Sequence, residues 1–273
     1  MSLSDTFNAD LSRFHSVDKG AVPTKYIDFI DWMRTWPEMR RQKALSVELL
    51  DLSDGDVAID IGCGTGEEAV AMLEQVAPTG RAYGLDNSGT MLTEARRRAG
   101  DRAGLEFLEG SIFELPFEDA TFDAIRCERL LEHLSEPRKA MDEMLRVAKP
   151  GARVVCISPD VDAQIFELPS KELTRRFVHH HCDRRTNGWA GRQLFRFFHT
   201  CGLERVTCTG FLHVVDNPEL QAVTIERKAR IAHEEGAIND AELQICTDHV
   251  AEIRKTGVAL FAVAHFLVSG IVP

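Results

Sequence analysis

The stretch Val57-Ala58-Ile59-Asp60-Ile61-Gly62-Cys63-Gly64-Thr65-Gly66-Glu67-Glu68 decides the fold. Its apolar run ends in three glycines at alternate positions, and a segment with helical periodicity follows. This pattern predicts a buried strand, a tight turn and a helix. Glycine suits such a turn because a Cβ would hold the backbone away from a ligand at the strand end, and because these turns visit positive φ. The stretch therefore predicts a nucleotide-binding turn.

The spacing of the glycines bears on which nucleotide binds. A dinucleotide fingerprint carries its last glycine at the position that Glu67 occupies here, and Glu68 follows directly. Two carboxylates at the start of a helix would repel a diphosphate. They favour a ligand without phosphate, such as one that bears a cation.

Length and composition limit the classes of partner. With 273 residues, 44% of them hydrophobic and 27% charged, the chain can bury a full core, and one domain with appendages is expected. The formal net charge of -11 argues against nucleic acid or an anionic membrane, because phosphate binding is driven by Lys and Arg. A small-molecule partner is favoured, and the oligomeric state is left open.

The ends and the cysteines bear on location. The first residues are polar, and no apolar run reaches 18 residues, so we expect neither a signal peptide nor a membrane span and place the protein in the cytoplasm. The seven cysteines are scattered without a CxxC pair and are expected to be free thiols.

A second expected strand, Arg81 to Leu85, ends at Asp86, about twenty residues past Gly66. A carboxylate at this position can accept hydrogen bonds from both hydroxyls of a ribose at once. The alternative is an exposed aspartate in a turn.

The two strand ends together carry a family resemblance. Asp60 to Gly66 resembles motif I, and Gly84 to Leu92 resembles motif II, of the Rossmann-like (class I) S-adenosylmethionine-dependent methyltransferases. The resemblance covers about residues 45 to 160 and is strongest to the ubiquinone/menaquinone-biosynthesis type and related small-molecule methyltransferases. It implies an α/β fold: a doubly wound, mostly parallel seven-stranded sheet with the last strand antiparallel, helices on both faces, an N-terminal helical arm and a helical cap.

The resemblance also implies which residues hold S-adenosylmethionine. They are Asp60, Gly62, Cys63, Gly64, Gly66, Asp86, Asn87, Met91, Ser111, Ile112 and Cys127. Met91 is expected against the adenine, and Ser111 stands where many relatives have aspartate. Arg40 is a candidate partner for the cofactor carboxylate, with a solvated cationic face as the alternative.

Candidates for the acceptor site are Tyr26, Asp160, Arg185, Trp189 and Arg192. The last three belong to a segment, residues 171–199, that is cationic in an otherwise acidic chain, which predicts a rim for an anionic acceptor. Pairing of these arginines with the acidic body is the alternative. His133 and His181 are catalytic candidates by location alone, and consecutive histidines at 179–181 do not have metal-ligand spacing, so no metal is expected.

We expect four segments along the chain. Residues 1–36 form an arm that is either a lid or a packing helix, 37–160 the cofactor-binding core, 161–202 an acceptor-site segment, and 203–273 closing strands with a helical insertion. The fifth strand is expected over Arg153–Ser158 and ends at Pro159-Asp160, with Asp160 and the following loop at the carboxyl edge of the sheet.

The implied reaction is in-line displacement of the donor's methyl group by an O, N, S or C nucleophile of a small molecule, in secondary or cofactor metabolism. Two alternatives remain: a cofactor-binding or regulatory protein without turnover, and an NAD-linked oxidoreductase, which the Glu67 argument disfavours.

Overall fold

The computed structural model describes residues 14–20 and 22–273. Its strands form one sheet in the order β3-β2-β1-β4-β5-β7-β6. The strands are β1 Val57–Ile61, β2 Arg81–Asp86, β3 Leu105–Glu109, β4 Phe122–Glu128, β5 Ala148–Phe166, β6 Glu204–Val214 and β7 Phe261–Ile271.

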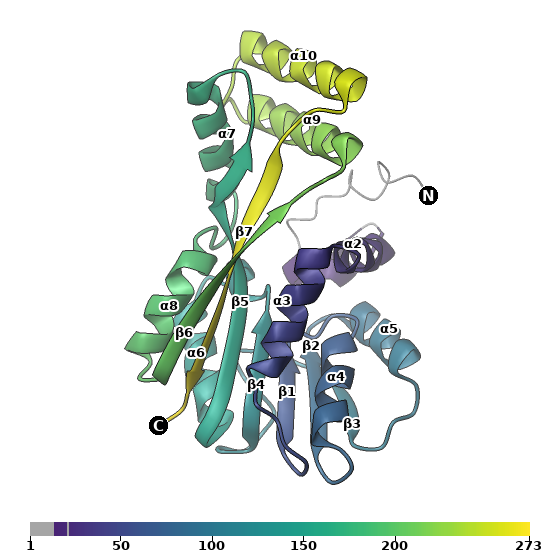
Figure 1. Ribbon diagram of the computed structural model, residues 1–273, viewed down its shortest axis with the longest axis vertical. Coiled ribbons are helices and arrows are strands. Elements are labelled where there is room, and N and C mark those ends of the chain that lie inside the picture. The colour runs from purple at the N-terminus through teal and green to yellow at the C-terminus, as the bar shows by residue number, and fades with distance from the viewer. Residues whose placement is uncertain (1–13, 21) are drawn as a thin grey trace.

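Helices connect and cover these strands (Figure 1). They are the 3₁₀ turns η1 Phe14–Lys19 and η2 Leu131–His133, and the α-helices α2 Thr24–Arg34, α3 Pro37–Glu48, α4 Glu67–Val76, α5 Gly89–Ala99, α6 Pro137–Val147, α7 Lys171–Asp183, α8 Ala190–Thr200, α9 Pro218–Glu234 and α10 Asp240–Thr256.

The topology confirms the predicted fold. Neighbouring strands from β3 to β5 run parallel, whereas β7 runs antiparallel to both β5 and β6. The strand order reverses at β1, which lies between β2 and β4, so the connections leave the sheet in opposite directions there. In open α/β sheets this reversal opens a crevice at the carboxyl ends of the strands, where ligands bind.

Apolar side chains cover the sheet on two faces. One buried cluster joins the sheet to α6 and α8, including Met141, Met144, Leu194 and Phe198. A second cluster covers the opposite face with Leu50 and residues of α4 such as Met72. The crevice therefore lies on a sheet whose faces are both packed, and its strand ends are fixed in place.

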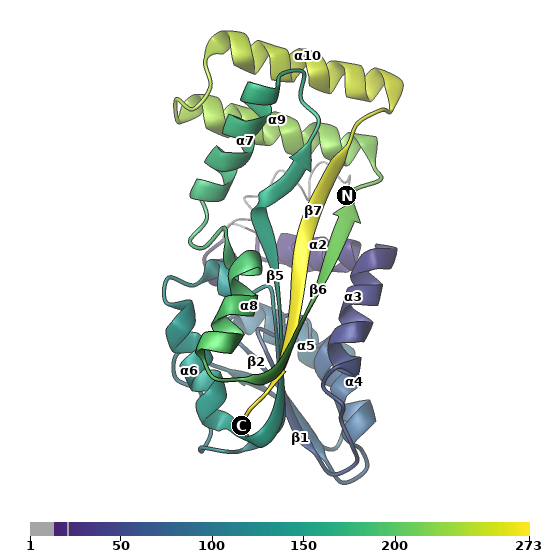
Figure 2. The same cartoon turned by 60° about the vertical axis from the view of Figure 1, so that its left-hand side comes forward.

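Strands β5, β6 and β7 extend well past the others and support a helical cap (Figures 1 and 2). We define this cap as helices α7, α9 and α10. β5 pairs with β7 as far as Phe166, which lies opposite Phe261. The prediction that the fifth strand ends at Pro159-Asp160 was therefore wrong. β5 continues to Phe166 and Asp160 lies inside it, opposite Ala264, because the antiparallel partner continues the ladder.

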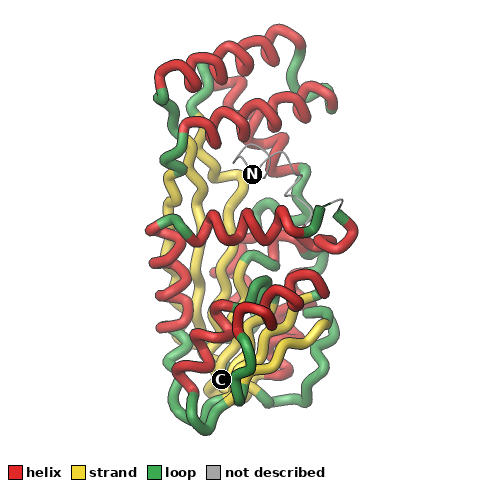
Figure 3. Tube along the Cα trace, turned by 90° about the vertical axis from the view of Figure 1, so that its right-hand side faces the viewer, coloured by secondary structure: helices red, strands yellow, loops and turns green. Residues whose placement is uncertain are grey.

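Helix α2 lies between the carboxyl ends of the sheet and the cap (Figure 3). Its residues Tyr26, Phe29 and Ile30 pack with a third buried cluster that is formed largely by the cap. The N-terminal arm thus contacts both halves of the molecule. None of the helices in the described part of the chain has the length and apolar character needed to cross a membrane.

Candidate functional site

The turn after β1 adopts the conformation that its glycines predict. Gly62, Gly64 and Gly66 have φ of 74°, 53° and 84°, the left-handed region in which a Cβ is strained. A Cβ on Gly66 would lie 2.6 Å from the Phe107 ring, so this glycine serves close packing beneath the turn. Gly62 and Gly64 line a cavity above it.

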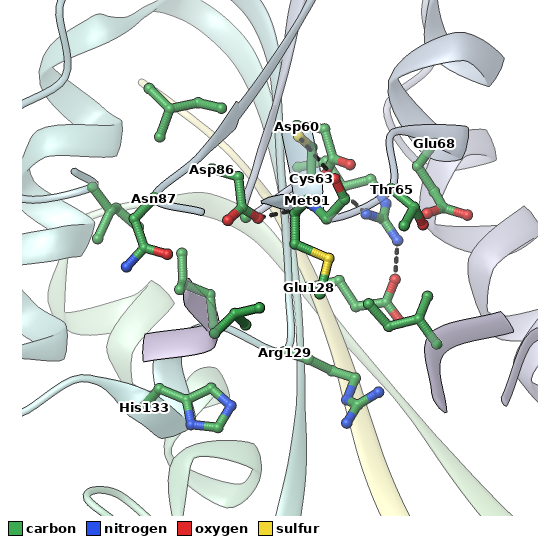
Figure 4. A pocket seen from close by; sticks show the side chains of 18 of the residues that line it. Asp60, Cys63, Thr65, Glu68, Asp86, Asn87, Met91, Glu128, Arg129 and His133 are labelled. Atoms are coloured by element: carbon green, nitrogen blue, oxygen red, sulfur yellow. Dashed lines mark hydrogen bonds and ion pairs between the residues drawn. The ribbon is translucent and has the colours of Figure 1, made fainter. Parts of the chain in front are cut away.

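This first cavity, of about 180 Å³, lies at the carboxyl ends of β1, β2 and β4 (Figure 4). It brings together ten residues that the sequence singled out, nine for the cofactor and one as a catalytic candidate: Asp60, Gly62, Cys63, Gly64, Asp86, Asn87, Met91, Ser111, Ile112 and His133. Gly66, Cys127 and Arg40 lie outside the set that lines it. Cys127 is part of the apolar core, and Arg40 lines a shallow surface hollow.

Asp86 is held by the backbone around it. Its Oδ2 accepts a hydrogen bond from the N–H of Gly64 at 2.9 Å, and its Oδ1 accepts one from the N–H of Ser88 at 3.0 Å. A carboxylate has about four lone-pair sites, so each oxygen keeps capacity for a further donor. Burial raises the pKa of Asp86 despite these two bonds.

Asp18, which the sequence did not single out, anchors the start of helix α5. Asp18 of η1 accepts hydrogen bonds from the Ser88 hydroxyl at 2.7 Å and the Gly89 N–H at 2.8 Å. It thus ties the N-terminal arm to the start of α5, next to Asp86. An isolated aspartate in a short polar segment gives no sequence signal for this contact.

A network of buried charged side chains lies at the wall of the first cavity. This network was not predicted from the sequence. Arg126 of β4 pairs with Asp60 at 2.8 Å and with Glu128, and Lys43 of α3 pairs with Glu128 at 2.7 Å. The sequence did contain a signal, because Arg126 and Glu128 stand at alternate positions in a mostly buried central strand. Charged side chains at such positions need partners.

One oxygen of this network is unpaired within residues 14–20 and 22–273. Asp60 is 1% exposed, and its Oδ2 has no hydrogen-bond partner among the described residues, although the residue lines the cavity. Burial raises the pKa of Asp60 to about 6, in spite of the opposing pull of Arg126. A carboxylate held this way places negative charge beside the cavity, where a cationic ligand group would be favoured.

The charge argument drawn from Glu67 and Glu68 needs correction. Glu67 pairs with Arg98 at 2.6 Å, and Glu68 pairs with Arg34 at 2.8 Å and Lys43 at 3.2 Å. Both carboxylates therefore form ion pairs with side chains from distant segments of the chain. Their negative charge is largely neutralised and would not repel a diphosphate as the sequence argument assumed. Sequence spacing alone could not identify those partners.

A second cavity, of about 150 Å³, adjoins the first and shares Met33, Arg129 and His133 with it. Arg129 follows β4 directly and has φ of 55°, a costly conformation for arginine that tends to occur at functional sites. Figure 4 shows Arg129 and His133 on the same side of the first cavity. The walls of the second cavity combine apolar and aromatic side chains, among them Phe29, Trp32, Trp36, Val161, Leu220 and Phe261.

Of the predicted acceptor-site residues, Arg185 lines this second cavity, and so does His181, a catalytic candidate. Burial lowers the pKa of His181 well below its usual value, and the nearby cations Lys228, Arg185 and Arg227 add to this effect.

The other acceptor candidates line neither cavity. Asp160 pairs with Arg192, whose guanidinium lies 4.8 Å from the centre of the half-exposed Trp189 ring. Tyr26 packs in the cap cluster. Within the cationic segment, Arg176, Arg184 and Arg192 pair with carboxylates, which is the alternative that the sequence left open.

The consecutive histidines have separate surroundings. His180 contacts Glu235 at 2.8 Å, His179 lies 3.7 Å from Asp162, and His181 is buried. Across residues 14–20 and 22–273 the structure contains no cluster of three or more metal-ligating side chains.

Comparison with known proteins places these features in context. A family model described as a methyltransferase domain matches residues 59–156. The chain is 30% identical to the demethylmenaquinone methyltransferase of Bacillus cytotoxicus over 68% of this chain and 87% of that enzyme. It is 32% identical to an uncharacterized 37.1 kDa protein in transposon TN4556 of Streptomyces fradiae, over 86% of this chain and 69% of that protein.

Among solved structures, phosphoethanolamine N-methyltransferase 2 of Haemonchus contortus, in complex with S-adenosyl-L-methionine, is similar with a TM-score of 0.63. It is 16% identical, and the match covers 95% of this chain and 60% of that one, which supports the fold. The chain spans only about half the length of several other demethylmenaquinone methyltransferases that it matches, 57% for that of Bacillus licheniformis.

Proposed function

Because the chain belongs to the Rossmann-like, S-adenosylmethionine-dependent methyltransferases, we propose that it methylates a small molecule held in the second cavity. The observation that carries this proposal is that the two cavities meet at Met33, Arg129 and His133. S-adenosylmethionine is the methyl donor. A donor in the first cavity and an acceptor in the second would have their reacting atoms at this junction.

The first cavity fits the donor. The carboxylate of Asp60 lies at the wall of this cavity and is placed to attract the ammonium group of the donor's methionine end by its charge. Gly62 and Gly64 let the backbone approach the ligand closely. Asp86 has spare lone pairs for the two ribose hydroxyls, and Met91 and Ile112 offer apolar surface for adenine.

The bound donor supplies a methyl group on a positively charged sulfur, a leaving group that needs little activation. The chain's main task is therefore to align the reactants and exclude water, which can supply about 7–11 kcal/mol. Helix α2 is placed for this task, because Ile30, Met33 and Arg34 line the first cavity and Phe29, Trp32 and Met33 line the second. We therefore assign residues 1–36 the role of a lid, and note that residues 1–13 and 21 lie outside the described residues.

The acceptor is proposed to be an apolar molecule that bears an acidic group. The second cavity is lined by four cationic side chains and one carboxylate, Glu132. The cations are Arg129, Arg185, Arg227 and Lys228. Lys228 is 7% exposed, donates to Gln164 Oε1 at 2.8 Å and has no ion-pair partner among the described residues. Burial, with Arg227 and Arg185 acting in the same direction, lowers the pKa of Lys228 well below its usual value, so an anionic ligand would stabilise its charged form.

These roles fit an enzyme of secondary or cofactor metabolism in the cytoplasm, with residues 161–202 and the insertion between β6 and β7 closing the acceptor site. The test is production of S-adenosylhomocysteine when the full chain is incubated with S-adenosylmethionine and a panel of aromatic hydroxy and amino carboxylates. Turnover with acidic members but not with their amides supports the proposal. Cofactor binding without turnover on any member would favour a regulatory protein instead.

A further inference from the structure

Gln42 of α3 lies fully buried between one carboxylate and two histidines. Its Nε2 donates a hydrogen bond to Glu128 Oε1 at 3.0 Å. Because an ionised carboxylate can only accept, this bond fixes which way the amide points. Burial opposes ionisation of Glu128, but Lys43 and Arg126 hold its pKa well below its usual value. The Oε1 of Gln42 must then face the histidines.

The amide orientation fixes the tautomers of both histidines. Gln42 Oε1 lies 2.9 Å from His213 Nε2 and 3.0 Å from His265 Nδ1. An amide oxygen only accepts, so each of these nitrogens must carry the proton. In a neutral ring the other nitrogen carries no proton and can only accept a hydrogen bond. These accepting atoms are His213 Nδ1 and His265 Nε2.

Both rings are held neutral. Burial lowers the pKa of His213 to about 4, with Arg129 adding to the effect and Glu38 and Glu128 opposing it. Burial lowers the pKa of His265 well below its usual value, with His213, Arg129 and Lys43 acting in the same direction and Glu128 against it. Near pH 7 each ring is therefore neutral and offers one lone pair as an acceptor.

The two rings that carry these lone pairs belong to residues of the acceptor cavity. Both histidines line it, and their rings contact each other with centroids 4.4 Å apart. His213 Nδ1 is sealed from solvent and has no hydrogen-bond partner in the described part of the chain. His265 Nε2 also has no hydrogen-bond partner among the described residues, but it is not one of the sealed atoms. Of the two, His265 is the one whose lone pair a ligand can reach.

We propose that His265 Nε2 accepts the proton of the acceptor's nucleophile, which makes the acceptor a hydroxyl compound and the reaction an O-methylation. The O–H bond breaks, its electron pair stays on the oxygen that attacks, and the proton forms an N–H bond that turns the ring into imidazolium. The proton passes to water when the product leaves. Gln42 is a positioning residue that keeps the proton-free nitrogen on the cavity side. This inference rests on the proposed function and names the acceptor class for the same site.

The first test is the tautomer itself, measured on the full chain with ¹⁵N-labelled histidine by long-range ¹H–¹⁵N correlation spectra at pH 7. The expected result is a neutral His265 with its proton on Nδ1. In Gln42→Met, which removes the amide oxygen, we expect the two tautomers to mix. A charged His265, or one protonated on Nε2, would overturn the proposal.

The second test compares phenol with anisole, which lacks the hydroxyl proton, by quenching of Trp32 and Trp36, which line the cavity. We expect the chain to favour phenol by about three- to ten-fold, the effect of one net hydrogen bond. His265→Phe should abolish the preference, whereas His179→Phe, in the cap and outside the cavity, should keep it. No phenol response in the parent chain, or an unchanged ratio in His265→Phe, would contradict the proposal. Neither test uses the methyl donor, so both stay informative if the proposed function fails.

Discussion

Arg126 and Asp60 face each other on the neighbouring strands β4 and β1 and form an ion pair at 2.8 Å, with both side chains almost wholly buried. Arg126 also pairs with Glu128. One guanidinium thus matches two carboxylates at the strand ends that form the first cavity. The network links the fold to the site, because Asp60 and Glu128 both line that cavity.

Replacement of Arg126 by Met should destabilise the protein by about 3–5 kcal/mol, because it leaves buried carboxylates without a counter-ion. Urea unfolding followed by circular dichroism measures the change. Arg138→Met is the control, since Arg138 forms a half-exposed pair with Asp142 that should contribute below about 1 kcal/mol. Equal midpoints for the two variants would contradict the structural role of Arg126.

Gly66→Ala should destabilise the fold more than Gly151→Ala does. Both glycines have φ of 84°, so alanine meets the same backbone strain of about 1–2 kcal/mol at either position. Only at Gly66 would the Cβ also meet Phe107, at 2.6 Å, whereas nothing lies within 4 Å at Gly151. The difference in melting temperature measures the cost of the contact, and no difference would show that Phe107 moves aside freely.

Much of the fold follows from local patterns. The glycines after β1, the aspartate after β2 and the alternation of apolar strands and helices are all read within a few residues, and the structure brings most of these residues to one cavity. The partners of Glu67 and Glu68 are different, because Arg98 and Arg34 lie about 30 residues away in sequence. No local pattern encodes such distances.

The second cavity was the part that sequence predicted least. Its residues come from elements spread over the whole chain, including α2, α3, η2, β5, α7, β6, α9 and β7, and the long antiparallel ladder between β5 and β7 helps to bring them together. The cationic segment contributed Arg185, but Lys228 and Arg227 come from α9, more than 40 residues later. Counting charged residues along the sequence does not show which arginines form ion pairs and which line a cavity.

Lys228→Met should weaken binding of an aromatic carboxylate in the second cavity. Methionine keeps the length of the side chain and removes the charge, so 3-phenylpropionate should lose about ten-fold in affinity, while 3-phenylpropionamide should be unaffected. Tryptophan fluorescence measures both. Arg192→Gln is the control, because Arg192 pairs with Asp160 and lines neither cavity. Equal losses for acid and amide in Lys228→Met would argue against an anionic acceptor.

Affinity for S-adenosylhomocysteine should fall as the pH drops below about 6. Burial raises the pKa of Asp60 to about 6, so below that pH the carboxyl is protonated and no longer attracts the ligand's ammonium group by its charge. Titration calorimetry from pH 5 to 8 measures the profile. In Asp60→Asn the profile should flatten in this range, and an unchanged slope would exclude Asp60 as the source.

The central claim is that Asp86 holds the ribose of the cofactor, and calorimetry with S-adenosylhomocysteine on Asp86→Ala tests it most directly. The matched control is Asp123→Ala, because Asp123 also accepts a backbone N–H, from Val57 at 2.9 Å, but at the opposite end of the sheet. The account predicts at least about a 100-fold loss of affinity for Asp86→Ala, from two hydrogen bonds to a charged group, and little change for the control. Parent-like affinity in a folded Asp86→Ala would contradict it.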